Sequence, residues 1–146
     1  MANDPRCLAA ARQCTAAQLR RATRIVSRLF DDTMAPSGLE GTQLTVLVTL
    51  SLAGEMSMRK LAERMAVDRT TLTRNLMPLE RNGWIESSAG ADQRVRLVRL
   101  TALGKKTLEK ALPLWEKAQH QVIAELGKTR WTELLALLQA VEKLAD

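Results

Sequence analysis

The sequence predicts a mainly α-helical fold that contains one small β-hairpin. Apolar side chains recur at helical spacing over most of the chain, which is typical of amphipathic helices. Short β-prone runs, separated by a loop of small residues, are confined to residues 84–88 and 94–100. The 146 residues, 46% of them hydrophobic, have the length of one ordinary domain and can bury a core.

The N-terminal segment is expected to form one long helix of about 30 residues. Asp4 and Pro5 are typical of an N-cap and a first helical residue. An apolar stripe then continues to Phe30, and Pro36 interrupts it. Such a helix spans roughly 45 Å, which is longer than a compact small domain can cover by itself.

Residues 42–54, TQLTVLVTLSLAG, carry an ambiguous pattern. Their apolar side chains alternate with polar ones from Leu44 to Leu52, and this local pattern alone predicts a strand. The position directly before a helical unit, together with the family resemblance described below, favours a buried helix. A helix is therefore predicted here.

Two short amphipathic helices follow, joined by a tight turn. Ser57 is a suitable N-cap for the first helix and Asp68 for the second, which ends at Asn82. Only two residues separate the end of the first apolar stripe from the second cap, so this is a helix-turn-helix layout. Pro78 lies inside the second helix, where it removes a backbone hydrogen bond and predicts a bend or an early end.

The C-terminal part begins with the hairpin and continues as two helices. WIESS (84–88) and RVRLVRL (94–100) are predicted to pair as a β-hairpin, or wing. Thr101 is the expected cap of the next helix, which Gly127 closes. The last helix carries an unbroken apolar stripe, expected to be core or dimer interface: Trp131, Leu134, Leu135, Leu138, Val141 and Leu144.

Positive charge is concentrated in the middle of the chain. The net charge is +6, which favours anionic partners such as nucleic acid. Residues 101–146 use lysine nearly balanced by glutamate, whereas residues 55–100 use mainly arginine, whose planar fork suits bases and phosphates. This contrast predicts a binding half and a structural half.

The second helix of a helix-turn-helix enters the major groove with its first turns on the base edges. The inward leucines of this helix turn Thr70, Thr71 and Arg74 outward, and Arg69 lies at its N-terminus. Threonine can contact any base edge and arginine can fork onto guanine. The alternative is that the threonines continue a capping network and the arginines form a solvated face.

The hairpin adds a second predicted contact. Arg94 lies at the end of the short loop, as a minor-groove probe would, and Asp92 can hold its guanidinium in place. By spacing alone the two could also form an ordinary turn pair. Arg96 and Arg99 would then lie over the DNA backbone. The predicted DNA-binding residues are Arg59, Arg69, Thr70, Thr71, Thr73, Arg74, Asp92, Arg94 and Arg96.

The chain resembles MarR-family transcriptional regulators, the multiple-antibiotic-resistance regulator type. The resemblance is carried by LAERMAVDRTTLTRNLMPLERNGWIE, the wing DQRVRLVRLTALGKK and the later ALPLWEKAQ. It implies a single domain, 1–146, in which residues 1–36 and 102–146 form dimerisation helices. Residues 39–100 form the winged helix-turn-helix DNA-binding lobe. It also implies that Asp92 and Arg94 match the family's wing signature.

These features predict a homodimeric, sequence-specific regulator of transcription that binds a roughly palindromic operator in double-stranded DNA. The resemblance implies a repressor released by a small apolar or phenolic ligand or by thiol oxidation. The alternative is an architectural or protein-interaction module that has no sequence-specific readout. Binding of wild-type protein without base preference would indicate that alternative.

Catalysis, metals and cofactors are not expected. The sequence contains one histidine and two cysteines, which are few of the residues that usually form a metal site or a catalytic triad. An enzyme using Glu86 and Asp92 as paired carboxylates would lack a basic partner set and a phosphate loop. No apolar run approaches the roughly 20 residues of a membrane span, and the chain starts without a signal-like segment, so a cytoplasmic protein without a membrane partner is expected.

Two switches can be considered from the residues. Cys7 lies in the first helical turn beside Arg6, where the thiolate is favoured. In a continuous helix Cys14 would stand about 10 Å away along the axis, too far for an intrachain disulfide, so a disulfide would join subunits or need local unfolding. The alternative is that both cysteines are small buried hydrophobes.

A ligand would need an apolar cleft between the dimerisation helices and the DNA-binding lobe. The apolar residues considered for its wall could equally be core. They are Leu44, Leu47, Met56, Met58, Trp84 and Trp115.

Overall fold

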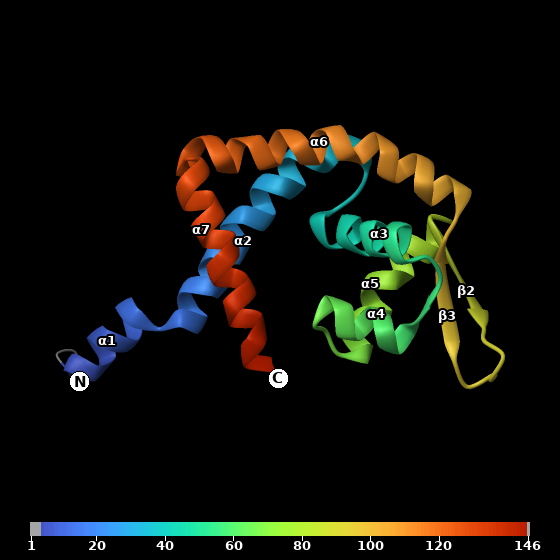
Figure 1. Cartoon of the computed structure of the whole chain (residues 1–146), viewed down its shortest axis with the longest axis horizontal. Coiled ribbons are helices and arrows are strands. Elements are labelled where there is room, and N and C mark those ends of the chain that lie inside the picture. Colours follow the sequence, from blue (N-terminus) through green and yellow to red (C-terminus); the bar gives the residue numbers. More distant parts are fainter. Residues whose placement is uncertain (1–3, 146) are drawn as a thin grey trace.

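The computed structural model describes residues 4–145 and has the predicted fold class, mainly helical with a small antiparallel sheet (Figure 1). The helices are α1 (Pro5–Gln13), α2 (Thr15–Met34), α3 (Gly41–Ala53), α4 (Met58–Met65), α5 (Arg69–Arg81), α6 (Ala102–Leu126) and α7 (Lys128–Glu142). The strands are β1 (Met56–Ser57), β2 (Ile85–Ala89) and β3 (Arg96–Leu100). Two short 3₁₀ turns, η1 (Ala35–Ser37) and η2 (Lys143–Ala145), follow α2 and α7.

Figure 1 shows two parts joined by α6. One part, here called the arm, consists of α1, α2 and α7. The other, here called the lobe, consists of α3, α4, α5 and the three strands. α6 contacts α2 and α7 on the arm side and α3 on the lobe side, so it bridges the two parts.

The lobe holds most of the hydrophobic core. Leucines from every lobe helix are fully buried there, with Val98 of β3 among them. The predicted helix over residues 42–54 is confirmed as α3. The alternation of apolar and polar residues does not predict which side chains are buried. Leu52 is 84% exposed, whereas the adjacent residues Val46 and Leu47 are both 0% exposed. The helix packs against α2, α5, α6 and β3, so apolar residues are needed on more than one of its faces.

The sheet has the order β1-β3-β2, and both pairings are antiparallel. The predicted hairpin is confirmed, with Ile85 opposite Leu100 and Ala89 opposite Arg96. β1 was not predicted, because two residues give no pattern of their own and the strand exists only by pairing with β3. Arg94 and Val95 lie in the loop and not in the strand.

The prediction of one continuous N-terminal helix is wrong. Cys14 has an extended backbone, with φ −70° and ψ 107°, and separates α1 from α2. Gln18 bridges the break, because its side-chain amide donates to the carbonyl oxygen of Arg12 and its backbone N–H donates to that of Cys14. Cysteine and Thr15 are both weak helix formers, which makes this the point where the helix is interrupted at low cost.

The helix caps agree with the sequence predictions. Asp4, Ser57, Asp68 and Thr101 each accept a hydrogen bond from a backbone N–H in the first turn of their helix. The early end considered at Pro78 does not occur, since α5 continues to Arg81. The proline lies in the last turn of α5, so few backbone hydrogen bonds follow it and the helix tolerates the residue.

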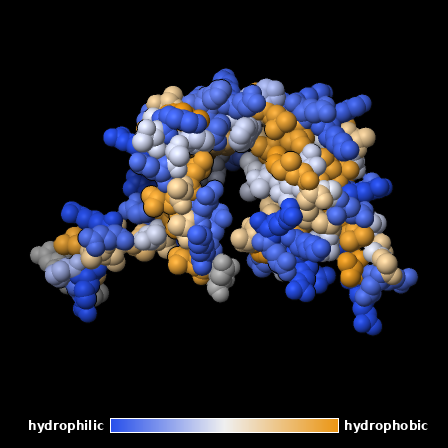
Figure 2. Space-filling model, in the orientation of Figure 1, coloured by the Kyte–Doolittle hydropathy of each residue, from blue (hydrophilic) through white to orange (hydrophobic). Residues whose placement is uncertain are grey.

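The arm is less buried than the lobe. The apolar stripe of α7 remains partly open in the single chain: Leu134 is 39% exposed, Leu138 37% and Val141 38%. Figure 2 shows apolar surface along the arm as well as beneath α6. Among the helices of residues 4–145, none has the length and apolarity that crossing a membrane requires.

Candidate nucleic-acid interface

The turn between α4 and α5 sets the position of the exposed helix face. Ala66 has φ 50°, in the left-handed region that is uncommon for a residue with a side chain. Its backbone N–H donates to the carbonyl oxygen of Glu63, and that of Val67 donates to Ala62. These hydrogen bonds end α4 at Met65, and Asp68 is the N-cap of α5.

The N-terminus of α5 is organised by Asp68. One carboxylate oxygen accepts the backbone N–H of Thr71 at 2.8 Å and the other accepts the Thr71 hydroxyl at 2.6 Å. Hydrogen bonds from the Thr71 hydroxyl, and then from its backbone N–H, lower the pKa of Asp68 below its ordinary value. The Thr71 hydroxyl therefore takes part in the capping network that was the alternative interpretation of this sequence.

The other threonines of this turn differ from Thr71. The Thr73 hydroxyl donates to the carbonyl oxygen of Arg69 at 2.8 Å. Thr70 is exposed, and its hydroxyl makes no hydrogen bond with residues 4–145. Arg69 and Arg74 are exposed beside it. Thr70 and the two arginines therefore offer the free polar groups on this face.

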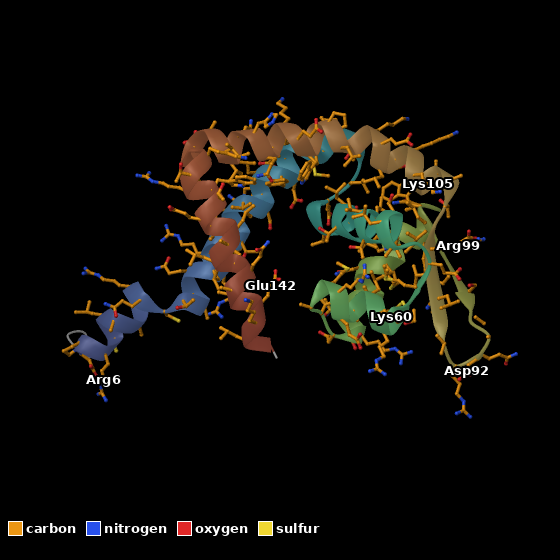
Figure 3. All side chains as sticks on the ribbon, viewed as in Figure 1. Arg6, Lys60, Asp92, Arg99, Lys105 and Glu142 are labelled. Carbon is orange, nitrogen blue, oxygen red and sulfur yellow. The ribbon has the colours of Figure 1, made fainter. Side chains whose placement is uncertain are left out.

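The wing loop is held by Asp92 in a way that differs from the prediction. The Asp92 carboxylate accepts the backbone N–H of Arg94 at 3.0 Å, and the Asp92 carbonyl oxygen accepts that of Val95 at 2.8 Å. The aspartate thus fixes the loop backbone and not the guanidinium, which forms no salt bridge within the described residues. Figure 3 shows Asp92 at the tip of the hairpin, on the same edge of the lobe as Lys60.

Three arginines that were expected to contact DNA are already engaged in ion pairs. Arg59 pairs with Glu63 at 2.8 Å, and Arg99 pairs with Glu86 at 2.8 Å. The hydrogen bond and charge of Glu63 raise the pKa of Arg59. The third arginine is Arg96, which pairs with Glu80 on α5.

Glu80 connects α5 to both strands of the hairpin. Its Oε1 atom accepts a guanidinium N–H of Arg96 on β3 at 2.7 Å, and the same oxygen accepts the hydroxyl of Ser87 on β2. We call these three residues the Glu80 clamp. The Glu80 side chain is 29% exposed and that of Arg96 49%, so the pair is only partly screened by water. Neither contact was predicted from the sequence.

A groove of about 610 Å³ separates the wing loop from the turn between α4 and α5. It brings together four of the predicted DNA-binding residues: Arg59, Arg69, Arg94 and Arg96. Its floor includes apolar side chains such as Met58 and Val67. The lobe therefore presents an exposed helix face and a wing tip with an arginine-lined groove between them.

Comparisons with known proteins agree with this geometry. The family model described as MarR family matches residues 39–95. The regulator BilQ of Clostridium symbiosum is 31% identical over 111 residues, which cover 73% of this chain and 77% of the relative. The chain belongs to the MarR family. The MarR family and these relatives are transcriptional regulators and not enzymes, as the sequence predicted.

Two further transcriptional regulators are similar to this chain. The Mycobacterium tuberculosis regulator MosR, solved in complex with DNA, is 41% identical, with a TM-score of 0.79 over 90% of this chain and 98% of the other. The Bacillus subtilis regulator YwoH, an uncharacterised helix-turn-helix regulator, is 29% identical over 108 residues, which cover 74% of this chain and 79% of the relative.

The two cysteines of this MarR-family chain are free thiols, with Cys7 exposed and Cys14 half-buried. Exposure of Cys7 argues against the interpretation that both are buried hydrophobes. The expected distance between them assumed a continuous helix, and that assumption fails at Cys14. No group of three metal-ligating side chains occurs among the described residues.

A cleft of about 410 Å³ lies between α2, α3 and α6, where the arm of this MarR-family fold meets the lobe. Of the side chains considered for it, Leu44 and Trp115 line it. Leu47, Met56 and Met58 are buried in the core of the lobe instead, and Trp84 packs against that core. The acidic side chains in its wall, Asp31 and Glu40, were not predicted, because they belong to different elements and give no local motif.

Proposed function

We propose that the protein is a sequence-specific double-stranded-DNA-binding transcriptional regulator in which α5 reads the major groove and the wing reaches the minor groove. The carrying observation is that Thr70, Arg69 and Arg74 are exposed together on the first turns of α5. Helices of this class contact base edges with these turns. The similar regulator MosR, at 41% identity, was solved in complex with DNA, which supports DNA binding by this chain.

Within this proposal the residues divide into two groups. Thr70 and Arg74 contact base edges, where a good bidentate contact contributes roughly 1–3 kcal/mol of discrimination. Arg59, Arg69 and Arg96 contact phosphates, and Arg94 enters the minor groove. Thr71, Thr73 and Asp92 hold the contacting elements in place through the hydrogen bonds described above.

The proposed assembly is a homodimer that binds a roughly palindromic operator. The long helices α2 and α6 and the partly exposed stripe of α7 carry apolar side chains on the surface. A second copy of the chain would cover them. The dimerisation segments are residues 1–36 and 102–146, and residues 39–100 form the DNA-binding unit. Two recognition helices would then stand about one turn of DNA, roughly 34 Å, apart or a multiple of that.

Selection from randomised duplex DNA tests the function. Purified protein is mixed with the duplex pool at about 0.15 M salt with excess competitor, since phosphate contacts depend strongly on salt. An enriched inverted repeat is the expected result. Binding without enrichment would contradict the proposal and would favour the architectural alternative.

We further propose a repressor that releases DNA when a small apolar ligand fills the cleft between arm and lobe. The cleft volume lies within the range of small-molecule sites, and it touches α3, which packs directly on α5. Oxidation of Cys7 is the second candidate for release, favoured by the exposure of its thiol in the single chain. Mass spectrometry after mild peroxide treatment, with DNA affinity measured on the same sample, tests release by oxidation separately from release by a ligand.

A further inference from the structure

The cleft between α2, α3 and α6 is unusually aromatic for this chain. The sequence contains three tryptophans, one phenylalanine and no tyrosine. Of these four aromatic residues, Phe30 and Trp115 both line the cleft, where they are joined by the aliphatic side chain of Leu44. Half of the aromatic residues of the protein therefore gather at one site of about 410 Å³.

The charge of the cleft is opposite to that of the protein. Asp31 and Glu40 line it, and no lysine or arginine is among its lining residues. The whole chain carries 22 lysines and arginines against 16 acidic residues. A cleft whose only charged lining residues are acidic selects against anions, because an entering carboxylate would face two negative charges with no positive partner.

Both acidic residues are positioned by the start of α3. Asp31 reaches from α2 and accepts the backbone N–H of Gly41 at 2.8 Å through Oδ1. Its second oxygen forms no hydrogen bond within residues 4–145. Glu40 is the N-cap of α3, and its backbone N–H donates to the side-chain oxygen of Gln43 at 3.1 Å. The two acidic residues are therefore placed at the cleft before any ligand arrives.

We propose that this cleft binds an organic cation, an amine or quaternary ammonium group carried on an apolar or aromatic body. Aromatic faces attract cations electrostatically, and nearby carboxylates add to that attraction. The inference rests on the proposed role of the cleft as the effector site, and it names the class of effector. Asp31 joins α2 to the start of α3, so an ammonium that pairs with it acts directly on the junction between arm and lobe.

Three probes with the same apolar body and different charge test the inference. They are phenylbutyl trimethylammonium, phenylbutanol and phenylbutanoate, titrated by calorimetry into the full chain without DNA. We expect the cation to bind roughly tenfold more tightly than the alcohol and the carboxylate to bind most weakly.

Two variants and a matched control locate the effect. Asp31→Asn keeps an oxygen that can accept the Gly41 N–H but removes the charge, and it should reduce the preference for the cation over the alcohol by about threefold to tenfold. Trp115→Leu should reduce the same preference, since it removes a cation-attracting face. Asp32→Asn removes a neighbouring exposed carboxylate that does not line the cleft, and it should change nothing.

Several outcomes would overturn the inference. These are equal or tighter binding of phenylbutanoate, no binding of any of the three probes, or an undiminished cation preference in Asp31→Asn. Operator binding by the ligand-free protein is measured on the same samples. Failure to bind the operator would refute the proposed DNA-binding function but not the proposed cation site, because calorimetry of the probes does not depend on DNA.

Discussion

Removing Glu80 tests whether the recognition helix and the wing are held as one unit. Glu80→Ala deletes the acceptor for both Arg96 and Ser87. A charge-assisted hydrogen bond contributes about 1.5–3 kcal/mol when shielded, but the half-exposed guanidinium reduces this to about 0.5–1 kcal/mol. The serine hydroxyl adds about 0.5–1 kcal/mol.

The expected loss in free energy of unfolding is therefore about 1–2 kcal/mol, or a fall in Tm of about 3–6 °C for a chain of this size. Operator affinity should also fall, because the wing that carries Arg94 is no longer tied to α5. Thermal unfolding and fluorescence anisotropy with the selected operator measure the two effects.

Glu86→Ala is the matched control. Glu86 pairs with Arg99 at 2.8 Å, but both residues belong to the hairpin and are at least half exposed, so the pair does not reach α5. Its removal should cost less than about 0.5 kcal/mol and leave operator affinity nearly unchanged. Equal effects of the two variants on stability and on affinity would refute the role of the Glu80 clamp.

Three further predictions concern the wing, the arm and the cap. Arg94→Ala should weaken operator binding roughly tenfold, as the loss of one charged contact of about 1.5 kcal/mol implies, without changing Tm; a lost dimer in sedimentation would show that the wing is misplaced. Leu134→Asp should raise the dimer dissociation constant by about a hundredfold or unfold the protein, since it buries an unpaired charge, and a monomer as stable as wild type would contradict the interface. The folded-state pKa of Asp68 is lowered, so its contribution to stability is present above the ordinary value of 3.8 and is lost as pH falls through the lowered value. Acid unfolding curves of Asp68→Asn should lack this component, and unchanged curves would refute it.

The sequence predicted well those features that depend on neighbouring residues. Ser57, Asp68 and Thr101 were identified as caps because a capping side chain acts within its own helical turn. The hairpin followed from two β-prone runs around a short loop. The fold class was therefore predictable from the sequence and the family resemblance.

Features that depend on distant contacts were missed. β1 forms only because Met56 meets Val98, 42 residues later in the numbering. The Glu80 clamp joins residues from three elements, and the cleft joins Asp31 to the start of α3 and to Trp115 on α6. No local pattern encodes these pairs, because each depends on how the elements pack.

The contact between Asp92 and Arg94 in the wing was predicted only in part. Spacing indicated that Asp92 and Arg94 interact, and they do, but through the backbone N–H of Arg94. A carboxylate two residues before an arginine can bond to either group, and the conformation of the loop decides between them.

The most direct test of base reading by α5 is to measure how every base-pair substitution in the selected operator changes the affinity of wild-type protein and of Arg74→Ala. Arg81→Ala, an exposed arginine at the far end of α5, serves as the control. We expect that Arg74→Ala loses discrimination at one position in each half-site, worth roughly 1–3 kcal/mol, while the other positions keep their preferences. Uniform weakening at all positions, with a reduced salt dependence, would show that Arg74 contacts only phosphate and would contradict sequence readout by this helix.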